Sequence, residues 1–439
     1  MQEIPQTKSD VISYSKSSTI QPSYQFLPIF QETGTQTMTI NTTAGQYSLF
    51  EIPVEVVNLS RTELCFTVTP GASGAGNYNR QYLNTIPYFT QVQLLSRKGQ
   101  EMVSINNADR VNAIMKRACV SLEEMLESDV TKGALSRVNA AGTNLRLDGS
   151  TCDIAYTEMK YTQIGGSNTA TPVIKFKIPL KELGIDSLLE MDKDLYFGEI
   201  VRLRLTWNTR EKTGFYGTAA ANNATGAAAY AQDVAISNLV LRLALQRDEK
   251  IVEHVRGKFS SGGISMLIPF ITSYARSLNA AVQTVDLKLD ANHGHSLLRV
   301  YHSVFSPSGT AAKEYQSDCG ADAIITSYYT SLDRKKMQQF DLDVSEGDDY
   351  QYNRAILEGS TLQSQNVYQY NWFHCDDFSG FKSVEDRKAY LQNVACGLPL
   401  SSEKTWSFYG NCVAANTDHL TVVVTQKVLN ITPSGISVV

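Results

Sequence analysis

Residues 238–247 read NLVLRLALQR, and this stretch indicates the fold class most directly. Every second position from Leu239 to Leu245 is a leucine, while the positions between them vary in polarity. Successive side chains of a β-strand point to opposite faces of the sheet, so this period predicts a strand with one buried face. The same alternation recurs in five other segments, EIVRLRLTW (199–207), IKFKI (174–178), ELCFTV (63–68), VDLKL (285–289) and LTVVVTQ (420–426). Polar stretches rich in Gly and Asn separate these segments, so the sequence predicts a mostly antiparallel β protein.

A few segments depart from this period. Residues 107–128, NADRVNAIMKRACVSLEEMLES, place their apolar side chains at helical spacing, and shorter helical patterns occur at 348–358 and 383–392. We interpret these as helices inserted between strands. Small, nearly uncharged residues fill 214–231, which predicts a loop. The first ~30 residues are polar and are predicted to form an arm without its own core.

Composition limits the class of protein. The chain has 439 residues, of which 42% are hydrophobic, so it is long enough for two domains or more, each with a buried core. The net charge is −5 and basic residues are not clustered, so we expect no direct, sequence-specific binding of nucleic acid. No segment reaches the roughly 18–20 consecutive apolar residues of a membrane span, and residues 1–18 lack an apolar signal core. We therefore expect the protein to be synthesised and kept in the cytosol, not secreted.

Seven cysteines are scattered along the chain, and none forms a C-x-x-C motif. An odd number of separated cysteines in a cytosolic protein predicts reduced thiols that pack as small hydrophobes. These residues are Cys65, Cys119, Cys152, Cys319, Cys375, Cys396 and Cys412.

Four of the twelve prolines suggest an internal repeat. Pro53 and Pro269 each follow an isoleucine and lie 216 residues apart, and Pro179 and Pro399 lie 220 residues apart. If the two offsets share one cause, the four prolines occupy equivalent strand starts or sheet edges in two similar halves. The alternative is that proline is found at strand starts and edges in any β protein.

A third similarity and a charged segment complete the hypothesis of two halves. LYFG ends at Gly198 and SFYG ends at Gly410, and both precede a long alternating segment. The charged segment 247–258 then separates two halves of about 200 residues, each the size of one β-sandwich with eight strands in two sheets, the jelly roll. The predicted fold is mostly β, with two tandem eight-stranded jelly-roll sandwiches and a few inserted helices. The predicted limits are 1–35 for an N-terminal arm, 36–248 for the first jelly roll and 249–439 for the second.

From about residue 36 onward, the sequence resembles a known family. FKIPLKEL (176–183) leading to FGEIVRLRLTW (197–207), the helix inserted in the first half, and the final LTVVVTQKVLNIT (420–432) are similar to the double jelly-roll major capsid proteins of the tectivirus and adenovirus lineage. YSLFEIPVEVVNLSRTELCFTV (47–68) is most similar to the coats of polinton-like viruses and virophages.

The resemblance implies a structural protein of a DNA virus. It implies a homotrimer, in which three copies of two upright jelly rolls form a pseudo-hexameric capsomer that self-assembles into an icosahedral shell. The implied partners are neighbouring capsomers, penton and minor capsid proteins, and an internal lipid membrane that faces the N-terminal arm. The expected location is the virion. The acidic balance agrees with a shell that needs no basic inner lining.

Histidines and carboxylates offer few candidates for chemistry. His293 and His295 are a conceivable metal-ligand pair, but no third ligand follows at a useful spacing, which favours a turn that holds two histidines. FHCDDF (373–378) is interpreted as a turn with surface carboxylates. Asp348 and Asp349 match the first turn of a helix.

The sequence therefore predicts no catalytic, cofactor-binding or metal-binding residue and no cofactor, and the protein is not expected to be an enzyme. Two alternatives remain open. One is a cytosolic carbohydrate-binding or carbohydrate-cleaving β-sandwich protein, because many lectins and hydrolases are jelly rolls. The other is a minor capsid or spike component with the same fold class.

Overall fold

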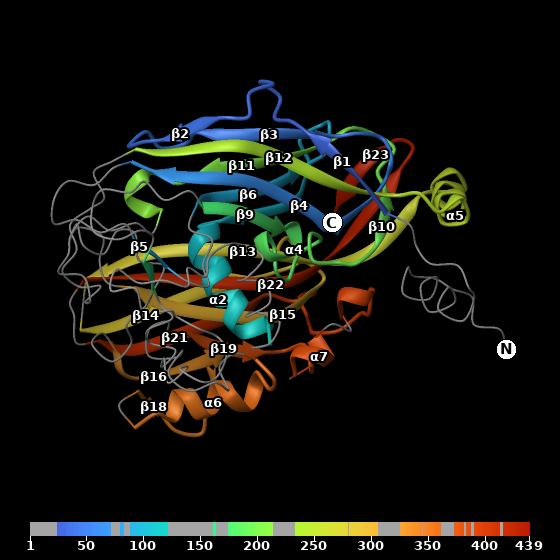
Figure 1. Cartoon of the computed structure of the whole chain (residues 1–439). Coiled ribbons are helices and arrows are strands. Elements are labelled where there is room, and N and C mark those ends of the chain that lie inside the picture. The colour runs from blue at the N-terminus through green and yellow to red at the C-terminus, as the bar shows by residue number, and fades with distance from the viewer. Residues whose placement is uncertain are drawn as a thin grey trace, which may run out of the picture.

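Two β-sandwiches lie one above the other in the computed structural model (Figure 1). They share one contiguous hydrophobic core, which extends from Ile40 in the first sandwich to Ile436 in the second. The structure describes residues 24–71, 80–82, 88–121, 161–163, 174–213, 233–279, 281–305, 325–344, 346–360, 373–381, 383–387, 390–412 and 416–439.

The first sandwich consists of two antiparallel sheets, which we name 1A and 1B. Sheet 1A has the strand order β1-β12-β4-β10, with β2 also paired to β12 and β9 also paired to β4, and sheet 1B has the order β3-β11-β6-β7. The strands are β1 (Tyr24–Ile29), β2 (Met38–Ile40), β3 (Tyr47–Ile52), β4 (Val56–Pro70), β6 (Phe89–Leu95), β7 (Glu101–Asn106), β9 (Ile174–Pro179), β10 (Asp194–Tyr196), β11 (Val201–Trp207) and β12 (Val234–Gln246). A separate pair joins β5 (Arg80–Tyr82) to β8 (Tyr161–Gln163).

The second sandwich consists of sheets 2A and 2B. Sheet 2A has the order β13-β22-β15-β19, with β20 also paired to β15 and β23 to β22, and sheet 2B has the order β14-β21-β16-β17, with β18 also paired to β16. The strands are β13 (Ile264–Asn279), β14 (Val282–Leu289), β15 (Ser296–Phe305), β16 (Ile325–Leu332), β17 (Lys335–Lys336), β18 (Leu342–Asp343), β19 (His374–Asp377), β20 (Leu398–Pro399), β21 (Lys404–Cys412), β22 (Asn416–Thr432) and β23 (Gly435–Val438).

The two sandwiches have the same topology, which is that of the jelly roll. Matching the strand orders pairs β1 and β2 with β13, β3 with β14, β4 with β15, β6 with β16, β7 with β17 and β18, β9 with β19, β10 with β20, β11 with β21, and β12 with β22. The predicted fold class of two tandem jelly rolls is therefore confirmed. The predicted alternation is confirmed too, since the leucines from Leu239 to Leu245 on β12 are all buried.

Helices cover the ends and sides of the sheets. They are α2 (Ala108–Cys119), α4 (Leu180–Leu183), α5 (Glu249–Ser260), α6 (Asp348–Ile356), α7 (Val384–Arg387) and the short 3-10 helices η1 (Arg210–Lys212) and η4 (Tyr390–Gln392). The predicted helix at 107–128 is confirmed over α2, and its last residues, like the predicted loop at 214–231, lie outside the described residues. In each sandwich the first long helix follows the same strand position, α2 after β7 and α6 after β18.

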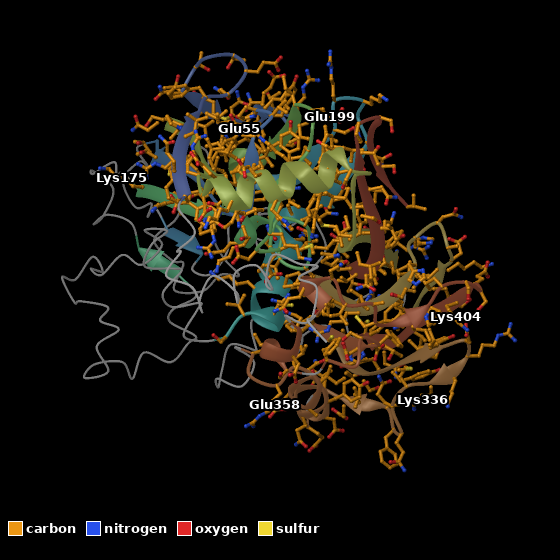
Figure 2. The ribbon with its side chains drawn as sticks, turned by 90° about the vertical axis from the view of Figure 1, so that its right-hand side faces the viewer. Glu55, Lys175, Glu199, Lys336, Glu358 and Lys404 are labelled. Carbon is orange, nitrogen blue, oxygen red and sulfur yellow. The ribbon has the colours of Figure 1, made fainter. Side chains whose placement is uncertain are left out.

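Helix α5 occupies the charged segment predicted to separate the halves. Its N-cap residue Asp248 accepts hydrogen bonds from the backbone of Lys250 (3.0 Å) and Ile251 (3.4 Å). The helix contacts β4 and β10 of the first sandwich and β22 of the second. In Figure 2, α5 crosses the upper half of the molecule with Glu55 and Glu199 labelled above it, and Glu55 forms an ion pair of 3.0 Å with Arg256 of the helix.

The proline repeat, as predicted, is wrong. Pro53 directly follows β3 of sheet 1B, whereas Pro269 lies within β13 of sheet 2A. Pro179 ends β9, whose counterpart is β19, whereas Pro399 ends β20, whose counterpart is β10. Neither pair lies on equivalent strands.

The prolines do not mark equivalent strands for a physical reason. Proline has no backbone N–H, so it fits any strand position whose N–H would form no hydrogen bond to a neighbouring strand, and every sheet edge offers such positions. In the described sheets, β3 and β13 end their strand orders, and β9 and β20 are side strands off the main path. The third similarity fails too, because LYFG (195–198) precedes β11 while SFYG (407–410) lies inside its counterpart β21.

Part of the predicted N-terminal arm is docked on the first sandwich. Tyr24 to Ile29 form β1, which pairs antiparallel with β12 from Gln246 to Leu241. Leu27 and Ile29 pack against the hydrophobic core. Residues 1–23 lie outside the described residues, and the limits 1–35, 36–248 and 249–439 stay predictions.

Candidate functional site

The contact between the two sandwiches contains a buried polar network. Strand β7 of sheet 1B runs beside β13 of sheet 2A, where the hydroxyl of Ser273 donates a hydrogen bond of 2.9 Å to the carbonyl of Asn106. Lys98, in the turn before β7, donates to the carbonyl of Ser434 at 3.2 Å. The first sandwich therefore covers the outer face of sheet 2A.

This cover explains why β22 departs from simple alternation. Val422, Val423 and Val424 are consecutive, and all three are buried. One face of the strand lines the core of the second sandwich, and the other faces the first sandwich. A sheet covered on both faces reads as a continuous apolar run.

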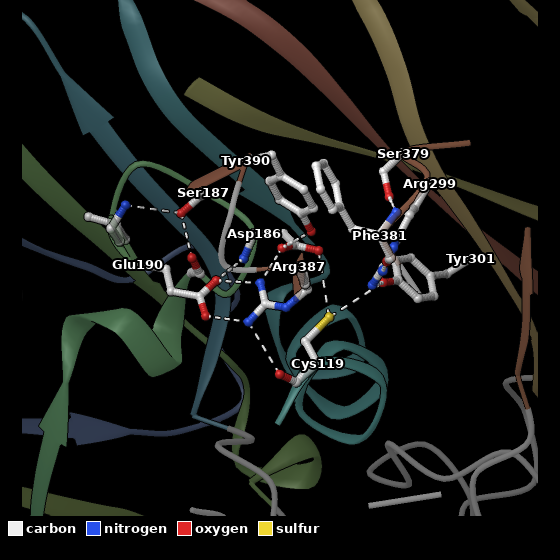
Figure 3. A network of polar contacts seen from close by, with 12 residues as sticks. Cys119, Asp186, Ser187, Glu190, Arg299, Tyr301, Ser379, Phe381, Arg387 and Tyr390 are labelled. Atoms are coloured by element: carbon white, nitrogen blue, oxygen red, sulfur yellow. Dashed lines mark hydrogen bonds and ion pairs between the residues drawn. The ribbon is translucent and has the colours of Figure 1, made fainter. Parts of the chain in front are cut away.

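Arg387 lies at the centre of the junction (Figure 3). It reaches from α7 to two carboxylates in the segment 185–192 of the first sandwich. Its guanidinium donates to Glu190 at 2.6 and 2.9 Å, and it also donates to Asp186 and, at 3.2 Å, to the carbonyl of Cys119 at the end of α2. Arg387 and Asp186 are fully buried. One buried cation thus joins three segments that are distant in sequence.

The network continues from Asp186 into sheet 2A. The hydroxyl of Tyr390 donates to Asp186 at 2.7 Å, and the thiol of Cys119 donates to the same carboxylate at 3.6 Å. The Cys119 sulfur also lies 3.4 Å from the hydroxyl of Tyr301, which accepts a hydrogen bond of 3.3 Å from Arg299. Figure 3 shows these groups as one connected chain of contacts between the sandwiches.

Electrostatics fix the charge states at the junction. Burial opposes the charged form of Arg387, but the carboxylates of Glu190 and Asp186 hold its pKa well above the usual value. Burial, followed by the charge of Asp186, raises the pKa of the Cys119 thiol to about 12. The cysteine is therefore a neutral thiol at neutral pH, and the arginine is the permanent charge that the carboxylates require.

Beyond the junction, a second polar network lies inside the second sandwich. The prediction that FHCDDF is a turn with surface carboxylates is wrong, because residues 374–377 form the buried strand β19. His374 Nε2 lies 3.0 Å from Asp376 Oδ1, and the indole of Trp406 donates to Asp376 Oδ2 at 2.8 Å. Burial acts to raise the pKa of Asp376, but His374 and the hydrogen bonds around it hold that pKa below its usual value. The local sequence does not show this burial, because Trp406, which satisfies Asp376 from across the sandwich, lies on β21, 30 residues further along the chain.

Two further histidines lie in the same interior. His302 Nε2 is 3.0 Å from His419 Nδ1, and the His302 ring stacks on Phe408 with 4.1 Å between ring centroids. His419 also contacts Gln283 through Nε2. Burial and the neighbouring histidines hold the pKa of His302 well below its usual value, and burial lowers the pKa of His419 to about 4. Both rings are therefore neutral at neutral pH.

The other predicted positions have ordinary structural roles. His293 lies in a turn, with Nδ1 2.8 Å from Asp290 Oδ1, and His295 uses its backbone N–H to donate to Gln426 at 2.7 Å. Asp348 and Asp349 occupy the first turn of α6, as expected. Across the ranges that the structure describes, no group of three or more His, Cys, Asp or Glu side chains is placed to hold a metal ion.

The cysteine prediction holds for the five cysteines that are described. Cys65, Cys119, Cys375, Cys396 and Cys412 are free thiols, and the other two lie outside the described residues.

No helix in the described part of the chain is long and apolar enough to cross a membrane.

The sequence and the fold were each compared with known proteins, and only the fold gave matches. No protein-family model matches the sequence, and no curated protein matches it. PBCV-1 VP54, in a crystal structure fitted into a cryo-EM reconstruction of the virophage Sputnik, superposes with a TM-score of 0.56 at 10% identity, over 95% of this chain and 97% of that one. The chain has the double jelly-roll fold. The Faustovirus major capsid protein gives a TM-score of 0.56 at 9% identity (94% and 91% covered), and the mavirus major capsid protein gives 0.54 at 9% (97% and 93% covered).

Proposed function

We propose that this double jelly-roll chain is a major capsid protein. It assembles as a trimer, and the trimer is a pseudo-hexameric capsomer of an icosahedral shell. The observation that carries the proposal is the fixed side-by-side pairing of two sandwiches with one topology. Three copies of such a pair present six similar sides, which is the shape that six-coordinated positions of a closed shell require. The likeness to capsid proteins over almost the whole chain supports the same conclusion.

The buried junction gives this block its rigidity. A capsomer side must keep its angle to its neighbours, and the buried Arg387 pairs hold one sandwich to the other. We infer a structural protein, not an enzyme, located in the virion after synthesis in the host cytosol. Its partners are copies of itself, neighbouring capsomers, penton and minor capsid proteins, and an internal lipid membrane facing the N-terminal arm.

Light scattering coupled to size-exclusion chromatography tests the first step. The expected species has about three times the chain mass of 48.5 kDa. Electron microscopy of the same sample should show capsomers with six-sided outlines. A protein that remains monomeric when concentrated would contradict the proposal.

A further inference from the structure

A chain of hydrogen bonds links the two sheets of the second sandwich. It runs from Thr421 to His302 and His419 in sheet 2A, and from His419 to Gln283 on β14 of sheet 2B. The side-chain oxygen of Gln283 also accepts a hydrogen bond of 2.7 Å from the hydroxyl of Thr417. These five side chains are buried, and we name them the histidine clasp.

The partners of the two rings assign the direction of each hydrogen bond in the clasp. An amide oxygen only accepts, so His419 Nε2 carries the proton and donates to Gln283. A neutral imidazole has one N–H, so His419 Nδ1 accepts from His302 Nε2 across 3.0 Å. His302 Nδ1 in turn accepts from the hydroxyl of Thr421 at 2.9 Å. With both rings neutral, every ring nitrogen has a complementary partner.

One added proton disrupts the clasp. A proton on His419 Nδ1 would face the N–H of His302, so two donors would oppose each other and the bond between the rings would be lost. A proton on His302 Nδ1 would instead place a charge on a ring that is 0% exposed, which is costly without an ionic partner. The clasp is therefore stable only while both rings are neutral.

The charges around the clasp do not compensate for an added proton. Burial, and then repulsion from His419 and His374, hold the pKa of His302 well below its usual value. Asp418 acts to raise the pKa of His419, but burial outweighs it and lowers that pKa to about 4. The buried carboxylate of Asp376 lies 3.0 Å from His374 and forms no hydrogen bond with either ring of the clasp in the described residues. Two other titratable groups nearby are neutral because burial raises the pKa of each, Cys412 and Tyr328.

The clasp lies at one end of the second sandwich. Gln283 and His419 are close to the starts of β14 and β22. Strand β13 begins beside α5 and ends at Asn279, which pairs with Asn416 at the start of β22. An extended strand of 16 residues is about 50 Å long. Figure 1 shows α5 at the right of the molecule and β13 running from it towards the left, so the clasp is remote from α5.

The first jelly roll has no equivalent of the clasp, because no histidine occurs before His254 in the sequence. Its described interior contains aromatic rings in mutual contact, which are Phe66, Tyr88, Phe89, Phe176 and Trp207. None of these side chains takes up a proton when the pH falls from about 7 to about 5. A response of the core to mild acid is therefore confined to one of the two halves.

We propose that the histidine clasp is an acid-sensitive switch, which closes one end of the second jelly roll at neutral pH and opens it locally at about pH 5. Sheets 2A and 2B separate at this end, while the first jelly roll stays folded. The switch goes beyond the proposed function, because it operates within a single chain. In a shell of such chains, every second jelly roll would loosen at the same end.

Hydrogen exchange of the full chain, followed by mass spectrometry at about pH 7 and about pH 5, tests the switch. Each histidine that is protonated only in the open state favours opening tenfold for every pH unit below about 6.5, which is about 30-fold at pH 5. After correction for the intrinsic exchange rates, peptides covering 281–287 and 417–423 should lose protection by at least this factor. Peptides covering β12 of the first jelly roll should keep theirs.

His419→Gln is the test variant, because glutamine can accept from His302 and donate to Gln283 but takes up no proton. It should reduce the acid-induced loss of protection by about 30-fold. His254→Gln is the matched control, since His254 is exposed on α5, and it should behave as the unmodified chain does. His302→Gln has the same expected result as His419→Gln and replaces it if that variant is unfolded at pH 7.

Three outcomes would overturn the switch. They are unchanged protection of 281–287 and 417–423 at pH 5, an equal loss of protection in β12, and an undiminished loss in a folded glutamine variant. None of them bears on whether the chain forms a trimer, which light scattering measures separately.

Discussion

Acidification should weaken the second jelly roll through its buried histidines. All six histidines of the chain lie after residue 248, and His302 and His419 are in contact within the second sandwich. His419 has a pKa of about 4 in the folded protein, against an ordinary value of 6.5. A histidine whose pKa is depressed by folding stabilises the protein while it is neutral. That contribution is complete above pH 6.5 and is lost as the pH falls towards 4.

The size of the effect follows from the two pKa values of His419. A gap between 6.5 and about 4 limits the loss to about 3 kcal/mol, at about 1.4 kcal/mol for each pH unit. At about pH 5 the unfolded chain is already protonated at this position and the folded chain is not, so the loss is about 2 kcal/mol. His302, whose pKa is also held low by burial, adds a loss of the same sign. Asp376 titrates at lower pH than this window, because its pKa is held below its usual value of 3.8.

Urea unfolding at a series of pH values from about 7 to about 5 measures the effect. The free energy of unfolding should fall with pH, and His419→Gln should flatten the slope, because glutamine has no proton to gain. His295→Gln is the control, since this histidine is exposed and outside the buried network, and it should leave the slope unchanged. If His419→Gln retained the full slope, the reasoning from burial would be refuted.

Two other substitutions, each with a matched control, have expected outcomes. Arg387→Ala removes the cation that faces the buried Asp186 and the part-buried Glu190, and it should cost about 3–5 kcal/mol of unfolding free energy. Arg61→Ala, in an exposed ion pair, should cost less than about 1 kcal/mol, and denaturant titration measures both. Gly198→Ala should lower the midpoint of thermal unfolding, because φ is +70° and a Cβ would meet the ring of Phe259 at 2.2 Å, whereas Gly34→Ala bears only the backbone strain of φ +71°.

Local sequence patterns were sufficient to predict the fold class. The leucines of β12 and the alternation in β11 indicate that one face of each strand is buried. This pattern depends only on the residues of the strand itself, so it can be predicted from the local sequence. The helix α2 was visible for the same reason. The division into two jelly rolls rested on the chain length, the charged segment 247–258, the proline offsets and the family resemblance; it is confirmed, although the prolines do not mark equivalent strands.

Pairings between distant segments were not predictable in this way. Arg387 finds Glu190 and Asp186 about 200 residues earlier, and nothing near Arg387 in the sequence marks it as buried. Asp376 reads as a surface carboxylate until Trp406 is known to lie beside it. The proline repeat was predicted wrongly for a related reason. The prolines reflect a local preference for sheet edges, which does not show that the two halves place them on equivalent strands.

The double burial of sheet 2A has a consequence for the independence of the two halves. Val422 and Val424 on one face of β22, and Val423 on the other, are all shielded from water, and the first jelly roll supplies one of the two shields. Separated from it, the second jelly roll would present a broad apolar surface to solvent. Although the two jelly rolls share one topology, they are not interchangeable, because the second depends on the first for its solubility. Cleaving the chain at α5 would therefore produce a C-terminal fragment that is prone to aggregate.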